Sequence, residues 1–192
     1  MSLPALAPAF TLDAARAAGL RKDQVYGLLH TGQIERLGHA VYVRTGSIDP
    51  ALAPLAAATA LRPAATLCLT SALLHHDLTD QIPFGTDIAL PRGQRHPAGF
   101  EHVTWRSFDP STFDIGRDEF TAAEDLRLAV YSPERTIVDC FRLAHQEGAD
   151  VAYTALRRWI RRRGSSPAAL LRVAASFPKA LPRIRQALEA LL

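Results

Sequence analysis

The apolar positions near the N-terminus repeat at helical spacing in two short segments. We predict one helix over residues 12–18, because Thr11 can cap its first turn and Gly19 can supply the left-handed residue that ends it. A second helix is predicted over about residues 21–31, with Gly32 at its end. The apolar positions of the two helices are Leu12, Ala15 and Ala18, then Val25, Leu28 and Leu29.

A β-hairpin is predicted directly after these helices. Residues 33–37 and 40–44 carry β-branched and aromatic side chains on either side of a turn at Gly38 and His39. Two short helices joined by a glycine-containing turn are typical of a helix-turn-helix, whose second helix lies in the major groove of DNA. The hairpin would be its wing. We therefore predict a winged helix-turn-helix DNA-binding domain over residues 1–47.

The rest of the chain alternates between helical and extended patterns. An alanine-rich helix is predicted over residues 51–61, and another runs from Thr66 or Thr70 to His76. Three β-compatible segments follow, at residues 87–90, 102–108 and 126–131. Later helices are predicted after a Ser132 cap with Pro133 first, after an Asp150 cap, and after Pro167 and Pro182. We predict an α+β fold, in which residues 48–192 form a mixed α+β body with a helical C-terminus.

Three segments together resemble the AbiEi-type antitoxins of type IV toxin–antitoxin systems, which are winged-helix transcriptional regulators. Residues 17–43 are similar to the family's turn, recognition helix and wing. Leu69–Leu78 is similar to a buried helix of the family, and Tyr131–Asp139 to its Ser-Pro-Glu-Arg-Thr helix opening. The resemblance implies an antitoxin domain over residues 48–192. It also implies an operator-binding autorepressor that counteracts a nucleotidyltransferase-type toxin encoded alongside.

Two features depart from the family pattern. The wing turn usually carries Arg-Gly before Val-Tyr, whereas this chain has His39 and Ala40 there. The helix that normally precedes Thr11 has only ten residues available, and Pro4 and Pro8 interrupt them. We therefore expect a weakened wing contact and a vestigial first helix.

The charge is unevenly distributed along the chain. The 192 residues carry 22 basic and 19 acidic side chains, for a net charge of +3 and a pI near 9.2. Residues 1–47 carry +2, the middle carries −7, and residues 151–192 carry +8 because eight arginines and Lys179 face Glu189 alone. An acidic body between two basic ends favours an anionic partner at the ends.

The candidate DNA contacts lie on the predicted recognition helix and hairpin. Gln24 can read adenine through two hydrogen bonds, and Arg21 or Lys22 can reach guanine or phosphate. Asp23 opposes binding because it lies on the outward face, so affinity would depend on the basic residues or on dimerisation. A winged domain used for protein contact is the alternative. The candidate DNA-binding residues are Arg21, Lys22, Gln24, Tyr26, His30, Arg36, His39 and Arg44.

A second basic cluster lies near the C-terminal end of the helix predicted after Asp150. Arg157 and Arg161 would form one i,i+4 pair, Arg158 and Arg162 another, and Arg163 follows. Positive charge is favourable at a helix C-terminus. The cluster is compatible with binding nucleic acid or an acidic toxin surface, or with a solvated face that complements the acidic middle.

No sequence motif indicates catalysis. P-loop, GxSxG and GxGxxG patterns are absent. His75, His76 and Asp77 are adjacent, and neighbouring helical residues point about 100° apart, so two of them cannot readily share one metal. The spacing of Asp87, Arg92 and Glu101 is not diagnostic of a nuclease. Glu134 and Arg135 are interpreted as a first-turn charge and an internal ion pair.

We therefore expect a protein that is not an enzyme and that needs no cofactor or metal. Cys68 and Cys140 are too few for a disulfide framework and are expected to be buried in a reducing cytoplasm. No signal peptide or membrane span is expected. Two alternatives stay open: a small nuclease-like enzyme with a winged-helix targeting module, and a stand-alone transcriptional regulator. The sequence leaves the oligomeric state open.

Overall fold

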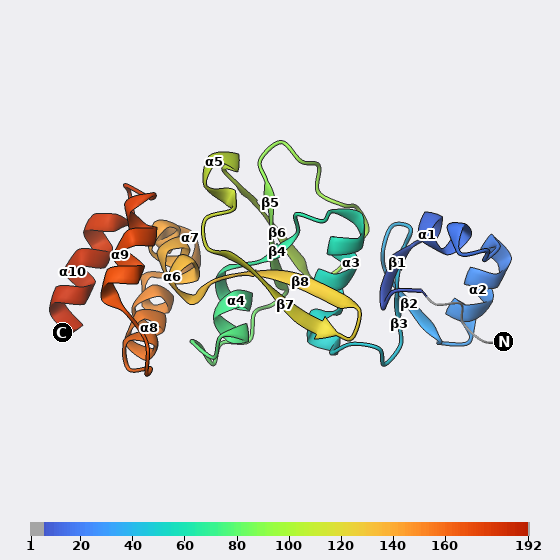
Figure 1. Cartoon of the computed structure of the whole chain (residues 1–192), viewed down its shortest axis with the longest axis horizontal. Helices are drawn as coiled ribbons and strands as arrows, with labels where there is room; N and C mark the ends of the chain where they lie inside the picture. The colour runs from blue at the N-terminus through green and yellow to red at the C-terminus, as the bar shows by residue number, and fades with distance from the viewer. Residues whose placement is uncertain (1–5, 192) are drawn as a thin grey trace.

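The computed structural model describes residues 6–191 and arranges them in three parts in series (Figure 1). An N-terminal unit is followed by a five-stranded sheet with its covering helices, and then by a group of C-terminal helices, so the two ends of the chain lie at opposite ends of the molecule. The predicted α+β class and the helical C-terminus are confirmed. Within the described residues, no helix is long and apolar enough to cross a membrane.

The two short helices and the hairpin lie where the sequence predicts them. Thr11 caps the first helix, since its hydroxyl accepts a hydrogen bond from the Ala14 amide at 3.1 Å, and Gly19 takes a φ of 88° after it. Residues 9–11 form a strand instead of a helix, and residues 1–5 of the expected first helix lie outside the described part. The elements of this unit are β1 (Ala9–Thr11), α1 (Leu12–Ala17), α2 (Lys22–His30), β2 (Ile34–Gly38) and β3 (Val41–Arg44).

The three N-terminal strands form an antiparallel sheet in the order β1-β3-β2, and each face has its own core. One face packs against α1 and α2. The other face packs against α3 (Ala53–Leu61), which follows a 3-10 turn, η1 (Pro50–Leu52). Ala9, Val41 and Val43 share one hydrophobic cluster with residues 55–58 of α3. This cluster crosses the boundary that the sequence predicts at residue 47. The core on the first face consists of Leu6, Phe10, Ala15, Leu20, Val25, Leu28, Ile34 and Tyr42.

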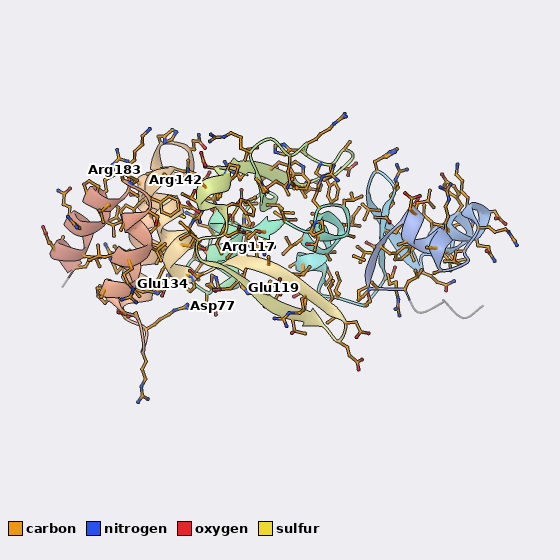
Figure 2. The ribbon with its side chains drawn as sticks, turned by 45° about the horizontal axis from the view of Figure 1, so that its top comes forward. Asp77, Arg117, Glu119, Glu134, Arg142 and Arg183 are labelled. Atoms are coloured by element: carbon orange, nitrogen blue, oxygen red, sulfur yellow. The ribbon has the colours of Figure 1, made fainter. Side chains whose placement is uncertain are left out.

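The central sheet mixes parallel and antiparallel pairs in the order β6-β5-β4-β8-β7. β4 pairs parallel with β8, and β5 with β6, while the β4–β5 and β7–β8 pairs are antiparallel. Arg117 and Glu119 of the outer strand β7 are labelled in Figure 2. The Arg117 side chain connects β7 to β4, because its Nε donates to Thr66 Oγ1 at 2.9 Å. The strands are β4 (Thr66–Leu67), β5 (Thr86–Pro91), β6 (Val103–Phe108), β7 (Arg117–Ala123) and β8 (Leu126–Tyr131).

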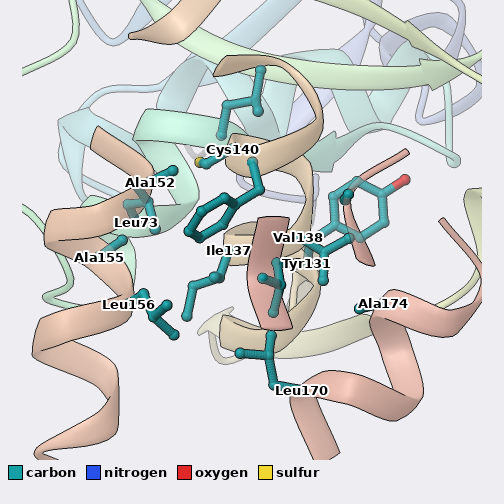
Figure 3. Packing of buried hydrophobic residues seen from close by; sticks show 14 of the residues in the cluster. Leu73, Tyr131, Ile137, Val138, Cys140, Ala152, Ala155, Leu156, Leu170 and Ala174 are labelled. Atoms are coloured by element: carbon teal, nitrogen blue, oxygen red, sulfur yellow. The ribbon is translucent and has the colours of Figure 1, made fainter. Parts of the chain in front are cut away.

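Helices α4, α6, α8, α9 and α10 contribute most of the largest hydrophobic cluster, and Figure 3 shows residues of α4, α6, α8 and α9 in it. Ser132 caps α6 as predicted, since its hydroxyl accepts from the Arg135 amide at 3.2 Å. The Asp150 cap was wrong, because Gly148, with a φ of 91°, precedes the helix and Asp150 lies in its first turn. The helices are α4 (Leu69–His75), α5 (Pro110–Phe113), α6 (Pro133–Arg142), α7 (Ala144–Glu147), α8 (Ala149–Ile160), α9 (Pro167–Ala175) and α10 (Leu181–Leu191).

A buried ion pair joins these layers. Arg135 is fully buried, and its Nε donates to Asp139 Oδ2 at 2.9 Å on the next turn of α6. Its Nη1 donates to the carbonyl of Thr112, within α5, and to that of Ile115, just after the helix ends. The guanidinium carbon lies 4.3 Å from the ring centroid of Tyr131 and 4.5 Å from that of Phe177. The predicted internal ion pair of Arg135 is therefore confirmed.

The second oxygen of Asp139 binds another arginine. Arg142 donates to Asp139 Oδ1 through Nη2 at 2.9 Å and through Nε at 3.2 Å. Burial raises the pKa of the Asp139 carboxyl, and the two guanidinium groups oppose that rise. One carboxylate thus lies between two guanidinium groups, and the contribution of this site to folding stability depends on all three charges being present.

We expect Asp139→Ala to reduce the free energy of unfolding by about 3–5 kcal/mol, because it leaves the Arg135 guanidinium buried without a counter-charge. Urea unfolding followed by circular dichroism measures the loss, and failure to fold would be the extreme of the same effect. Arg127→Met is the matched control: it breaks the exposed Arg127–Glu119 pair and should cost less than about 1 kcal/mol. Equal losses in the two variants would contradict the central role of the buried pair.

Candidate nucleic-acid interface

The outward face of α2 presents four of the predicted contact residues to solvent. Arg21, Lys22, Tyr26 and His30 are all exposed, and Tyr26 is one of the few large apolar side chains that are half exposed. The Lys22 ammonium lies 5.7 Å from the Tyr26 ring centroid, so the two side chains support each other across one turn of the helix. The inward face is anchored by Val25 and Leu28, which are buried. The fold thus fixes which side of α2 is open.

Asp23 does not face solvent as an isolated negative charge. Arg21 donates through Nε and Nη2 to the two carboxylate oxygens of Asp23, both at 3.3 Å. The hydrogen bond from Arg21 lowers the pKa of Asp23. This pair offsets the repulsion that the sequence analysis expected between Asp23 and phosphate, but it also occupies Arg21.

Gln24 has a structural role at the start of α2. Its Oε1 accepts a hydrogen bond from the Arg21 amide at 2.8 Å, which satisfies a backbone donor that the helix cannot satisfy itself. Reading adenine through two hydrogen bonds requires this oxygen as an acceptor. Gln24 would have to give up the cap to make that contact.

Two arginines of the hairpin lie on the same side of the sheet as α2. Directly opposed residues of antiparallel strands point to one face, and Arg36 pairs with Tyr42 while Ile34 pairs with Arg44. Tyr42 and Ile34 belong to the core beneath α1 and α2. Arg44 Nη1 donates to the Leu6 carbonyl at 3.0 Å, so Arg44 is partly buried in the unit. Arg36 is exposed, and its Nε donates to the Gly38 carbonyl at 3.1 Å.

The tip of the hairpin is held by the central body. The His39 amide donates to the Ala98 carbonyl at 2.9 Å, in the loop between β5 and β6. Phe100 packs on Gly38 so closely that a Cβ at Gly38 would lie 2.4 Å from the ring. The side chain of His39 is exposed, but its backbone is not free to enter a minor groove without leaving this contact.

The C-terminal arginines do not form one patch. α8 ends at Ile160, so Arg161–Arg163 follow the helix and the predicted i,i+4 pairs do not extend along one helix face. Arg158 Nη1 donates to Asp80 at 2.9 Å, and Arg162 Nη2 donates to the Asp77 carbonyl at 2.7 Å, so both hold the turn after α4. Arg157, Arg161 and Arg163 are exposed and make no ion pair within residues 6–191.

The arginines at the end of α8 lie far from α2. Arg162 donates to the carbonyl of Asp77, which is labelled in Figure 2 where the C-terminal helices meet the central body. These helices lie at the far end of the molecule from α2 (Figure 1). A continuous basic groove from α2 to Arg157–Arg163 is therefore not present in the described chain.

Near the end of α4, His76 is partly buried, whereas His75 is exposed. His76 Nε2 donates to the Tyr131 carbonyl at 2.7 Å, and the His75 ring centroid lies 4.5 Å from that of Phe120, with the two rings tilted by 44°. Burial lowers the pKa of both imidazoles, and the neighbouring His76 lowers that of His75 further. Among the described residues, no group of three His, Cys, Asp or Glu side chains is placed to hold a metal.

The residues considered for a nuclease-like set lie apart. Arg92 pairs with Asp109 at the far end of β5, and Glu101 is exposed before β6. Asp87 instead accepts from Arg106 at 3.0 Å, and Glu147 of α7 lies 2.7 Å from the same guanidinium. Burial raises the pKa of Asp87 and that of Glu147. No motif in the sequence marks this cluster, because its members come from three separate elements, β5, β6 and α7.

The comparisons with known proteins add no relative. No protein-family model matches the chain, and no curated protein sequence matches it.

Partial desolvation of His75, which lowers its pKa although the residue is exposed, makes stability depend on pH. The unfolded chain binds a proton at the ordinary histidine pKa of 6.5, whereas folded His75 resists it, so the wild type loses stability as pH falls below that value. Relative to the wild type, His75→Phe should therefore gain stability between pH 7 and pH 5. Urea unfolding at several pH values measures the difference. A stability difference between His75→Phe and the wild type that does not change with pH would contradict the lowered pKa of His75.

Proposed function

We propose that this chain is a DNA-binding transcriptional regulator whose N-terminal unit works as a winged helix-turn-helix. The observation that carries the proposal is the pair of short helices α1 and α2, joined through the left-handed Gly19 and mounted on a small sheet that leaves the outer face of α2 open. Such a second helix is short and rigid enough to enter a major groove. A regulator of this kind works in the cytoplasm, where its DNA lies.

Lys22, Tyr26 and His30 are the side chains best placed to contact DNA. They share the exposed face of α2, and Lys22 has no carboxylate partner within the described chain, whereas Arg21 is engaged with Asp23. Arg36 extends the same side of the unit from β2. Affinity in this arrangement comes from a few phosphate contacts, which makes it weak for one protomer and favours two protomers on a two-fold operator.

We further propose that the regulator is an antitoxin and autorepressor that counteracts a nucleotidyltransferase-type toxin. This part rests on the resemblance of residues 17–43, 69–78 and 131–139 to the AbiEi-type antitoxins. Co-expression with the product of a neighbouring nucleotidyltransferase-type gene tests it. Rescue of growth would support the antitoxin, whereas DNA binding without rescue would indicate a stand-alone regulator.

DNA from upstream of the chain's own coding sequence should bind, and Lys22→Ala should reduce the slope of log affinity against log salt by about 1, the loss of one phosphate contact. Fluorescence anisotropy at several salt concentrations measures both. Lys179→Ala is the matched control, since it removes the other lysine of the chain at the opposite end of the molecule. Absence of binding by the wild type at low salt would refute the repressor.

The exposed arginines after α8 should not contribute to this affinity. One duplex lying along α2 does not reach them, so the variant with Arg157, Arg161 and Arg163 all changed to alanine should keep the wild-type salt slope. The same anisotropy titration measures it. A slope lower by about 2 or 3 would show that DNA wraps along the body to the C-terminal helices.

A further inference from the structure

A cavity of about 390 Å³ opens where the first turn of α3 meets α4 and the start of β5. A volume of this order is typical of sites that take a small organic molecule. Six side chains make its apolar wall: Leu52, Pro54, Leu67, Leu74, Ile82 and Pro83. Ile82 is 88 % exposed, although an aliphatic side chain of this size gains from being covered. The cavity and its rim therefore expose apolar side chains that a bound molecule could cover.

A small number of polar groups face the same space. Ser71 Oγ accepts from the Asp87 amide at 2.8 Å, which leaves its hydroxyl proton to donate. His75 lines the cavity close to Ser71 on the next turn of α4, and His102 lies across from them. A neutral imidazole offers one donor and one acceptor. The cavity can thus make one or two hydrogen bonds to a group at the end of an apolar molecule.

The charges of the cavity exclude strongly ionic ligands. No lysine or arginine is among its lining residues, so a phosphate or sulfonate would enter without a counter-charge. Its one carboxylate, Asp49, accepts from the Ala51 amide at 2.9 Å as the cap of η1. Complementarity therefore favours an uncharged occupant.

Two walls of the cavity belong to the segments that hold the N-terminal unit on the body. Asp49–Pro54 leads directly into α3, whose residues 55–58 pack against β1 and β3. His102 ends the loop whose Ala98 carbonyl accepts from the His39 amide at the hairpin tip. A molecule in the cavity touches both connections at once.

We infer that this cavity binds an uncharged aromatic or alicyclic molecule with one hydroxyl or amide group, and that its occupancy alters the attachment of the N-terminal unit. The binding site stands independently of DNA recognition, while its meaning as an effector site rests on the proposed regulator function. A ligand that contacts both connecting segments more favourably in one arrangement of the N-terminal unit than in another shifts the equilibrium toward that arrangement.

Isothermal titration calorimetry with 2-naphthol tests the site, and 2-naphthalenesulfonate is the matched charged probe. We expect saturable binding of 2-naphthol with 1:1 stoichiometry and at least about tenfold weaker binding of the sulfonate. Leu74→Trp, which fills the cavity, should weaken 2-naphthol binding by about tenfold or more. Tyr153→Trp is the control, because Tyr153 is 40 % exposed like Leu74 but lies on α8 away from the cavity. His75→Phe should weaken it by about fivefold through the lost hydrogen bond.

Hydrogen exchange of the N-terminal unit tests the coupling without using DNA. Bound 2-naphthol should change protection of the His39 amide and of the β1 and β3 amides by at least about threefold, and Leu74→Trp should abolish the change. No saturable binding, or equal binding by Leu74→Trp and Tyr153→Trp, would overturn the site. Binding with unchanged exchange would overturn the coupling. Neither result depends on operator binding, so failure of the repressor proposal is recognised separately.

Discussion

The position of the Arg135 guanidinium determines how the C-terminal half of the molecule is assembled. A charge buried this completely is tolerated only where counter-charge, carbonyls and aromatic faces surround it. These partners come from α6, from α5 and the residues just after it, from the end of β8 and from the segment after α9. Apolar side chains can pack in many arrangements, whereas the fixed N–H directions of a guanidinium group can be satisfied by only a few arrangements of acceptors. One side chain thus specifies the relation of sheet to helices that the hydrophobic contacts in Figure 3 merely stabilise.

Local signals in the sequence predicted the elements whose ends are marked by particular residues. Thr11, Gly19 and Ser132 define helix ends through their own side chains or backbone freedom, and the structure uses all three. β7 was missed because its sequence, Arg117–Ala123, carries three charges and little apolar alternation; it exists because β8 lies beside it. Edge strands often carry such charges, which discourage pairing with other chains.

The candidate site was harder to predict than the fold, because its properties depend on which polar atoms are already occupied. Gln24 and Arg21 have the right chemistry for bases and phosphates, yet a helix cap and an ion pair engage them. Arg158 and Arg162 look equivalent to Arg157 and Arg161 in the sequence, and only the fold brings Asp80 and Asp77 to them from far along the chain. Charge counted along a sequence overestimates the charge that a partner meets.

The packing of Phe100 on Gly38 has a consequence for how such a protein can evolve. The glycine at the end of β2 leaves room for a ring that belongs to the body, so the N-terminal unit and the body fit closely at this point. Residues 1–47 are therefore not an interchangeable module. A recombinant protein that joined residues 1–47 to a different body would need both the glycine at position 38 and the ring of Phe100. Exchange of the N-terminal unit between proteins would therefore be restricted to pairs that keep this contact.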